Sequence, residues 1–151
     1  MATADQIYVD PSALTCLYLH QRERSRQIVA WRAGVDGALP VTHHGRTEIA
    51  NAICLARFRG ELDDVGLKEA LADFENDFAS GQLHQADILW RAALNRATEL
   101  SRAHTPTLGT RSLDVLHVAC ALELKRRHFL TFDERQRKLA AAAGLKNIKL
   151  G

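Results

Sequence analysis

The sequence contains no long run of apolar residues. Its 151 residues are 46% hydrophobic, yet no window approaches the roughly 18 consecutive apolar residues that a membrane-spanning helix needs. Residues 1–9 also lack the basic start and the apolar stretch of a secretory signal. We therefore expect a cytoplasmic protein that has no contact with a membrane.

Cysteine is scarce as well. Cys16, Cys54 and Cys120 are far apart, and each falls in an apolar helical pattern. An odd number of cysteines at such spacings fits neither a disulfide framework nor a zinc motif. We expect all three to be small core side chains of a protein in a reducing compartment.

Neither sign of charge is in large excess. The 20 basic and 18 acidic residues leave a formal net charge of +2, which does not by itself indicate a nucleic-acid-binding protein. Fifteen of the basic residues are arginines, whose guanidinium groups suit phosphate recognition. A GC-rich genome would produce the same bias, so this signal is weak.

Short apolar stretches alternate with helical patterns, without a repeat, a low-complexity segment or a linker. The expected strands are residues 7–9, 38–42, 82–85, 128–131 and 147–150. The expected helices are residues 12–19, a second helix ending near 34, then 44–58, 64–79, 86–104, 112–126 and 133–143. Residues 105–110 are expected to form a loop because they contain proline and glycine. This order predicts a single α/β domain, residues 1–151, built as a three-layer α/β/α sandwich around a short parallel sheet of about five strands.

Four carboxylates fall at positions that such a fold brings to one edge of the sheet. Asp10 ends the first strand, Glu48 lies early in the helix after the second strand, and Asp133 begins the helix after the fourth strand. Asp114 lies in the first turn of a helix that must run antiparallel to the fourth strand, so it reaches the same carboxyl edge. Each acid alone has a structural explanation: Asp10 and Asp133 as helix caps, with Gln136 at the capping-box position of Asp133, and Glu48 as a surface residue. Stabilisation of the helix dipole explains Asp114 less well, because apolar residues surround it. The coincidence of the four acids is what indicates a functional site.

Such a cluster calls for a cation. Carboxylates about 4 Å apart repel each other by roughly 4 kcal/mol at an effective dielectric constant near 20. Oxygen ligands select hard ions such as Mg²⁺ or Mn²⁺, which serve phosphate chemistry. No cysteine or histidine set in the sequence competes for zinc: we expect His43 and His44 in a solvated turn. His117 is expected to hydrogen-bond within the wall of the site, in preference to binding metal.

Four blocks of this sequence resemble the signature blocks of PIN domains, and more narrowly those of VapC toxins from bacterial toxin–antitoxin pairs. The blocks are VDPSAL at residues 9–14, TEI at 47–49, RSLDVLHVA at 111–119 and LTFDER at 130–135. Together they span the chain in the family's order. Pro11 departs from the family, which often has a threonine or another polar residue there, but no acidic position changes.

The resemblance implies a metal-dependent endoribonuclease that acts as the toxin of a type II toxin–antitoxin pair. Asp10, Glu48, Asp114 and Asp133 match the acidic quartet of the family. In that interpretation Asp10, Asp114 and Asp133 hold Mg²⁺, directly or through water. Glu48 then helps to position the metal or the attacking water.

The resemblance also implies supporting residues and partners. Ser12 and Thr131 match small polar positions that orient the acids. The candidates for phosphate contacts are arginines, although a solvated basic face explains them equally well: Arg111, Arg22, Arg24 and Arg26. Family members commonly form homodimers and are inhibited by a VapB-type antitoxin that occupies the acidic cleft. Tyr18 and Trp31 would serve that contact or simply the core.

Two other interpretations fit parts of the pattern. A receiver-like signalling domain also gathers acids around Mg²⁺, but it needs a lysine at the end of a later strand, and residues 130–133 contain none. A non-catalytic RNA-binding module with a PIN-like fold would not need an intact acidic quartet. The RNA target and the number of metal ions stay open.

Overall fold

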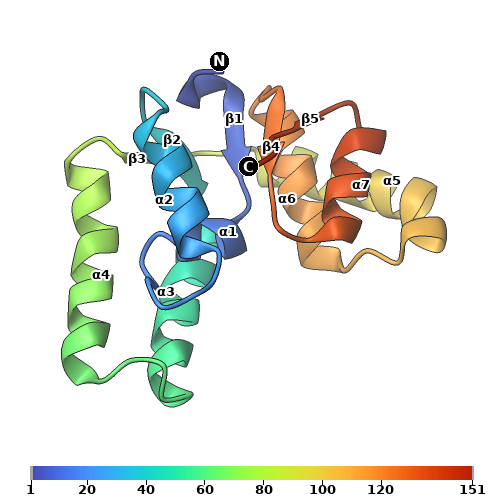
Figure 1. Ribbon diagram of the computed structural model, residues 1–151. Coiled ribbons are helices and arrows are strands. Elements are labelled where there is room, and N and C mark those ends of the chain that lie inside the picture. Colours follow the sequence, from blue (N-terminus) through green and yellow to red (C-terminus); the bar gives the residue numbers. More distant parts are fainter. Residues whose placement is uncertain (1, 151) are drawn as a thin grey trace.

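Parallel strands run through the middle of the fold, with helices on both sides of them (Figure 1). The computed structural model describes residues 2–150, so Met1 and Gly151, the ends of the predicted domain, lie outside the described residues. The elements in chain order are η1 (Ala4–Gln6), β1 (Ile7–Val9), α1 (Pro11–Thr15), α2 (Ser25–Ala33), β2 (Leu39–Thr42), α3 (His43–Phe58), α4 (Asp64–Ala79), β3 (Leu83–Ala86), α5 (Trp90–Leu108), α6 (Ser112–Glu123), β4 (His128–Leu130), α7 (Glu134–Ala142) and β5 (Lys146–Asn147). The α/β prediction is therefore confirmed.

The strands of the described chain do not form the one five-stranded sheet that the sequence predicted. They form a three-stranded sheet in the order β1-β4-β5 and a separate β2-β3 pair, both parallel. β1 lies between β4, to which it is hydrogen-bonded, and β2, which it contacts without a ladder. The N–H of Leu39 points toward β3, because it donates to the carbonyl of Gln82, the residue just before that strand. Successive N–H groups of a strand point to opposite sides, so the next N–H along β2 would face β1. That next residue is Pro40, which has no N–H to donate.

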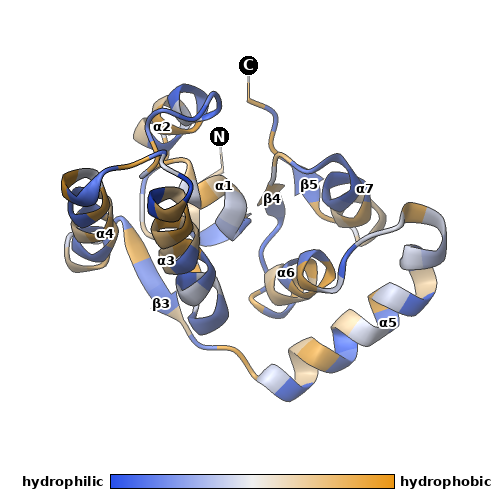
Figure 2. Cartoon of the chain, turned by 90° about the horizontal axis from the view of Figure 1, so that it is seen from below, coloured by the Kyte–Doolittle hydropathy of each residue, from blue (hydrophilic) through white to orange (hydrophobic). Residues whose placement is uncertain are grey.

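β1 separates two hydrophobic cores. Successive side chains of a strand point to opposite faces, and accordingly Ile7 and Val9 belong to the core beneath α1–α4. Tyr8 belongs to the second core, with α6, α7 and Phe129. Figure 2 shows α6, coloured mostly as hydrophobic, between α5 and α7. Asp10 follows directly after this strand, at the point where the two halves of the molecule meet.

The predicted loop at residues 105–110 is wrong for residues 105–108, which are helical, and only residues 109 and 110 lie outside a helix as expected. α5 runs from Trp90 to Leu108, through Pro106, and ends only at Gly109, whose φ is +67°. A proline in the last turn removes one hydrogen bond to the carbonyl four residues earlier, and Arg102, which carries that carbonyl, is exposed to water. The helix also starts later than expected, because β3 extends to Ala86 and residues 87–89 are a loop.

Candidate metal and phosphate site

Asp10 combines a capping role with a position inside the site. It is the N-cap of α1 and is only 3% exposed. Its Oδ2 accepts hydrogen bonds from the backbone N–H of Ser12 (3.2 Å) and from the Ser12 hydroxyl. Its Oδ1 accepts a hydrogen bond from Nε2 of Gln136 at 3.0 Å. Ser12 thus contacts the carboxylate that it was expected to orient.

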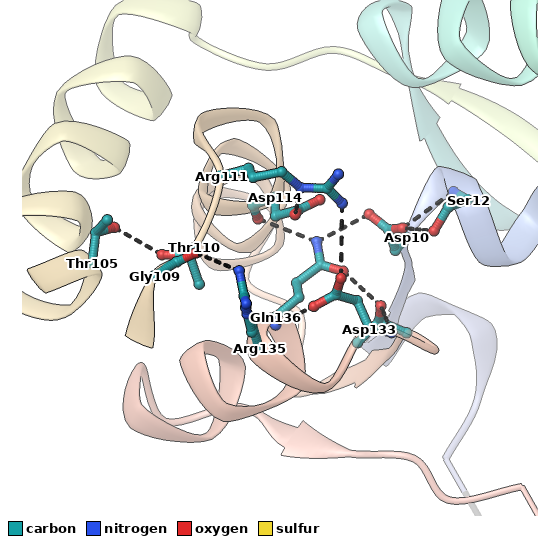
Figure 3. A network of polar contacts seen from close by, with 11 residues as sticks. Asp10, Ser12, Thr105, Gly109, Thr110, Arg111, Asp114, Asp133, Arg135 and Gln136 are labelled. Carbon is teal, nitrogen blue, oxygen red and sulfur yellow. Dashed lines mark hydrogen bonds and ion pairs between the residues drawn. The ribbon is translucent and has the colours of Figure 1, made fainter. Parts of the chain in front are cut away.

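Gln136 joins three of the predicted acids (Figure 3). It is fully buried in α7, and its side-chain amide donates to Asp10 and to the backbone carbonyl of Asp114 (3.2 Å). Its Oε1 accepts from the hydroxyl of Thr131 (2.6 Å), and its backbone N–H donates to Oδ1 of Asp133 (2.8 Å). The capping-box prediction for Gln136 is therefore half right: Asp133 is the cap. The backbone N–H of Asp133 does not bond the Gln136 side chain; it donates to the hydroxyl of Thr131 at 3.1 Å.

Arg111 supplies positive charge between two of the carboxylates. This residue is the N-cap of α6, and its side chain is 76% exposed. Its guanidinium donates to Oδ2 of Asp114 at 3.1 Å and lies 3.8 Å from Oδ2 of Asp133. The cation that the acidic cluster was expected to require is thus partly provided by the chain itself.

Asp114 experiences the mutual repulsion of the acids. Burial raises the pKa of Asp114, and the nearby charges of Asp10 and Asp133 raise it further. The hydrogen bond and charge of Arg111 offset part of this rise. A cation bound here would favour the ionised form of the carboxyl group.

Glu48, the fourth predicted acid, is paired with two histidines. Its Oε2 lies 3.0 Å from Nε2 of His117, and its Oε1 lies 2.8 Å from Nε2 of His44. Burial favours a higher pKa for Glu48, but the hydrogen bond to His117 and the charges of both imidazoles outweigh it, so the pKa lies below its usual value. The opposite holds for His117: burial lowers its pKa, but Glu48 and Asp10 raise it above the ordinary value.

The two histidine predictions have different outcomes. His117 hydrogen-bonds within the wall of the site, as expected, because its Nδ1 also bonds the hydroxyl of Tyr8 (2.7 Å). The prediction that His44 lies in a solvated turn is wrong: it is in the first turn of α3 and packs against the ring of His117 at 5.5 Å. Within residues 2–150, the ligand atoms of His44, Glu48 and His117 form the one set that lies within 4.8 Å of each other.

Two pockets adjoin the carboxylates. One, of about 420 Å³, is lined by Asp10, Glu48 and Asp114, with Arg111 and His117. Another, of about 390 Å³, is lined by Asp114 and Asp133 on the far side of Arg111. The four acids therefore border one region around the Arg111 side chain, but they do not close into a single compact ligand set.

The other predicted phosphate contacts surround a larger pocket nearby. Arg22, Arg24 and Arg26 line a pocket of about 960 Å³, to which Arg137 also contributes. Arg24 stacks over the ring of Phe132 (4.7 Å). A smaller pocket of about 380 Å³ is lined by Arg22 and Arg24 on one side and by the site residues Ser12 and Asp133 on the other. The basic pocket therefore reaches the edge of the acidic site.

Three peripheral expectations can be compared with the structure. Cys16 and Cys120 are buried as expected, but Cys54 is exposed on α3, so the core assignment of that residue is wrong. Tyr18 is a core residue whose hydroxyl donates to Asp77 (2.6 Å), and Trp31 packs against the same core. Among the described residues, no helix has both the length and the apolarity to cross a membrane.

Comparison with models of known protein families gives no match, and a search of curated proteins finds no similar sequence. The function is therefore inferred from the geometry of the site.

Sequence reasoning missed two components of this site. The sequence predicted Gln136 only as the capping-box partner of Asp133, because it gives no indication of which way the Gln136 side chain turns. The signal for His44 was present: His44 and Glu48 are four residues apart, a spacing that puts both side chains on one helix face.

Proposed function

We propose that this protein is a metal-dependent endoribonuclease of the PIN-domain class, acting as a VapC-type toxin in the cytoplasm. The observation that carries the proposal is the meeting of Asp10, Asp114 and Asp133 around Gln136 and Arg111. These acids come from three separate elements and share one edge of parallel strands, where ligand chemistry concentrates in α/β folds. The basic pocket beside them supports a phosphate-rich substrate.

The donor set fits a hard divalent ion. Asp10, Asp114 and Asp133 offer only oxygen, and Mg²⁺ commonly binds through one or two carboxylates while keeping several of its waters. Direct contact by every acid is therefore unnecessary, which suits three carboxylates that border one region without closing on a point. Bound Mg²⁺, or Mn²⁺, would supply a Lewis acid and an activated water for phosphodiester hydrolysis.

The residues around the ion would divide the remaining work. Gln136 and Ser12 hold Asp10 through both of its oxygens, and Thr131 positions Asp133 through its backbone N–H. Glu48 faces the same pocket as Asp10 and Asp114, where its carboxylate would orient the attacking water. Pre-positioned groups of this kind lower the barrier because little reorganisation is needed during reaction.

The arginines would bind the RNA backbone. The exposed side chain of Arg111 lies between two acids. It would leave them to bind an RNA phosphate that enters the site. Arg22, Arg24 and Arg26 line the neighbouring pocket. Phosphate contacts of this type fix the position of a nucleic acid without reading its sequence.

The proposal extends to partners and to the sheet. A VapB-type antitoxin would inhibit the enzyme by covering the acidic cleft, and two copies of the chain would form a homodimer. In the complete PIN-like arrangement, the β2-β3 pair would continue the β1-β4-β5 sheet past β1, giving five strands in the middle of a three-layer sandwich.

The test is cleavage of RNA by purified protein, with growth arrest on induced expression as a second readout. Asp10→Asn and Asp114→Asn should abolish both while the circular dichroism spectrum stays unchanged. Asp87→Asn is the matched control, because the Asp87 side chain is 94% exposed and lies outside the site. Removal of divalent ions with EDTA should stop cleavage, and added Mg²⁺ should restore it. Full activity in either site variant would refute the assignment.

A further inference from the structure

The side chains of His44, Glu48 and His117 form a second group with the geometry of a metal site. His44 and Glu48 lie four residues apart on α3, and His117 reaches them from α6. One carboxylate faces both imidazoles: Oε1 lies 2.8 Å from His44 Nε2, and Oε2 lies 3.0 Å from His117 Nε2. All three ligand atoms lie within 4.8 Å of one another.

The imidazole of His44 approaches Glu48 without forming a hydrogen bond. Its Nε2 atom is buried and makes no hydrogen bond within residues 2–150, because its short contact with Glu48 lacks hydrogen-bond geometry. A buried polar atom without a hydrogen bond is costly. The 32% exposed side chain can shift slightly to share an ion with the other two ligands. Such a shift suffices, since zinc–ligand distances of about 2.0–2.2 Å keep ligand atoms within roughly 4 Å of each other.

His117 has the outer contact that metal-binding histidines use. Its Nδ1 is hydrogen-bonded to the buried hydroxyl of Tyr8 at 2.7 Å. A hydrogen bond at one ring nitrogen fixes the orientation of the imidazole and directs the other nitrogen at the metal. Here that other nitrogen, Nε2, is the one that faces Glu48.

We propose that His44, Glu48 and His117 bind a transition-metal ion of the Zn²⁺ class, at a site separate from the three-aspartate group. Two imidazoles and one carboxylate are a ligand set that zinc uses when a fourth position is left to water. Nitrogen ligands suit Zn²⁺, Co²⁺ and Ni²⁺, whereas an oxygen-only set suits Mg²⁺. The two groups therefore differ in the ion that they select. Each group contributes two residues to one pocket, Asp10 and Asp114 from the three-aspartate group and Glu48 and His117 from the other.

Titration with Co²⁺ tests the site, because its visible absorption reports nitrogen ligation and low coordination number. The wild-type protein should bind one Co²⁺ with these bands, and added Zn²⁺ should displace it. His44→Gln should weaken that affinity at least about tenfold, since loss of even an outer contact of a metal ligand typically costs about 10- to 100-fold. His43→Gln is the matched control: His43 is the neighbouring residue, its side chain is 64% exposed, and it does not belong to the group.

The same titration separates this site from the proposed catalytic ions. Asp114→Asn should abolish RNA cleavage but leave the Co²⁺ bands and affinity unchanged. The inference is overturned if wild-type protein gives no such bands, if His44→Gln binds as tightly as wild type, or if Asp114→Asn removes the bands. The His44 side chain is partly exposed, so His44→Gln should keep the wild-type circular dichroism spectrum, whereas substitution of the buried His117 would test folding as well. The Co²⁺ readout does not require RNA cleavage, so it stands if the proposed function fails.

Discussion

Among single residues, Gln136 has the largest share in holding the carboxylates together. Every polar group of its side chain is used, and the residue is fully buried. The bond to Asp10 has no substitute, because Asp10 is itself buried and Ser12 occupies its other oxygen. Loss of the amide would leave a buried carboxylate oxygen without a donor, which costs more than an ordinary hydrogen bond contributes.

We therefore expect Gln136→Leu to lower the free energy of unfolding by about 1–3 kcal/mol. Urea denaturation followed by circular dichroism measures the change. Gln27→Leu is the control: Gln27 is exposed on α2, and its substitution should stay within about 0.5 kcal/mol of wild type. Equal stability of Gln136→Leu and wild type would mean that the amide does not support the site.

Arg111 is expected to compete with a metal ion for Asp114 and Asp133. Its guanidinium is a mobile positive charge at the place where the carboxylates repel each other. Arg111→Gln removes that charge, so Mg²⁺ should bind more tightly, by about 1.5- to 5-fold given the modest strength of exposed ion pairs. Isothermal titration calorimetry at low salt measures this affinity.

Arg91→Gln provides the comparison for Arg111, because Arg91 is exposed at the start of α5 and is not part of the site. It should leave the Mg²⁺ affinity unchanged. The same Arg111→Gln protein should bind RNA more weakly, since it loses a phosphate contact. Unchanged or weaker Mg²⁺ binding in Arg111→Gln would show that the guanidinium does not compete.

The sequence predicts the place of a residue where local chemistry such as helix capping determines it. It does not predict the direction of a side chain that depends on tertiary packing. Asp10 and Asp133 stand at element boundaries, and capping chemistry alone gives their places. Glu48 was expected to point toward the other acids. Its turn toward His44 and His117 depends on the packing of α3 against α6, which local sequence patterns do not encode.

At the scale of elements, α3 is positioned by its N-cap. The hydroxyl of Thr42 accepts a hydrogen bond from the backbone N–H of Gly45 at 2.9 Å, and Thr42 is buried at the end of β2. This cap sets where the helix begins, and so it sets the first turn that carries His44 and, one turn later, Glu48. Both side chains also contact His117 of α6, so the start of α3 sets how they meet that residue.

Thr42→Ala should therefore lower the free energy of unfolding by about 0.5–2 kcal/mol, the usual cost of losing such a cap. Thr42→Ser keeps the hydroxyl and should recover most of that loss. Thr47→Ala, an exposed change in the same helix, should be neutral or slightly stabilising because alanine favours helix. Thermal unfolding of the three variants measures the differences. An equally stable Thr42→Ala would exclude the cap as the determinant of α3.

Two prolines explain why the elements could be only partly predicted. Pro106 was expected to end α5, yet the helix continues for two more residues to Leu108, where Gly109 closes it. Pro40 lies in a predicted strand, as expected, but it removes the donor that would join β2 to β1. Alternation of apolar stretches predicted four of the strands closely, whereas β5 is Lys146–Asn147 and shares only Asn147 with the predicted residues 147–150. The alternation could not reveal that β2 and β3 pair apart from the other three strands.

At the scale of the whole molecule, β1 holds the two cores together. Its side chains alternate between them, and Asp10 stands at its end. The buried cysteines report on the cores separately: Cys16 belongs to the core with Ile7 and Val9, and Cys120 to the core with Tyr8. If the chain is one domain, the two cores unfold together, since neither is complete without β1.

Thiol labelling tests whether the two cores unfold together. In Cys54→Ser, which removes the exposed thiol, neither remaining cysteine should react quickly at pH 8. Burial raises the pKa of Cys16, and burial raises that of Cys120 to about 12 with help from Glu123 and Glu48, so the reactive thiolate is rare at both. Pulsed labelling through a urea series, read by mass spectrometry of peptides, should give the same midpoint for Cys16 and Cys120. Separate midpoints would mean that the halves on either side of β1 unfold independently. The acidic site would then lie between two units, and its geometry would depend on how they dock.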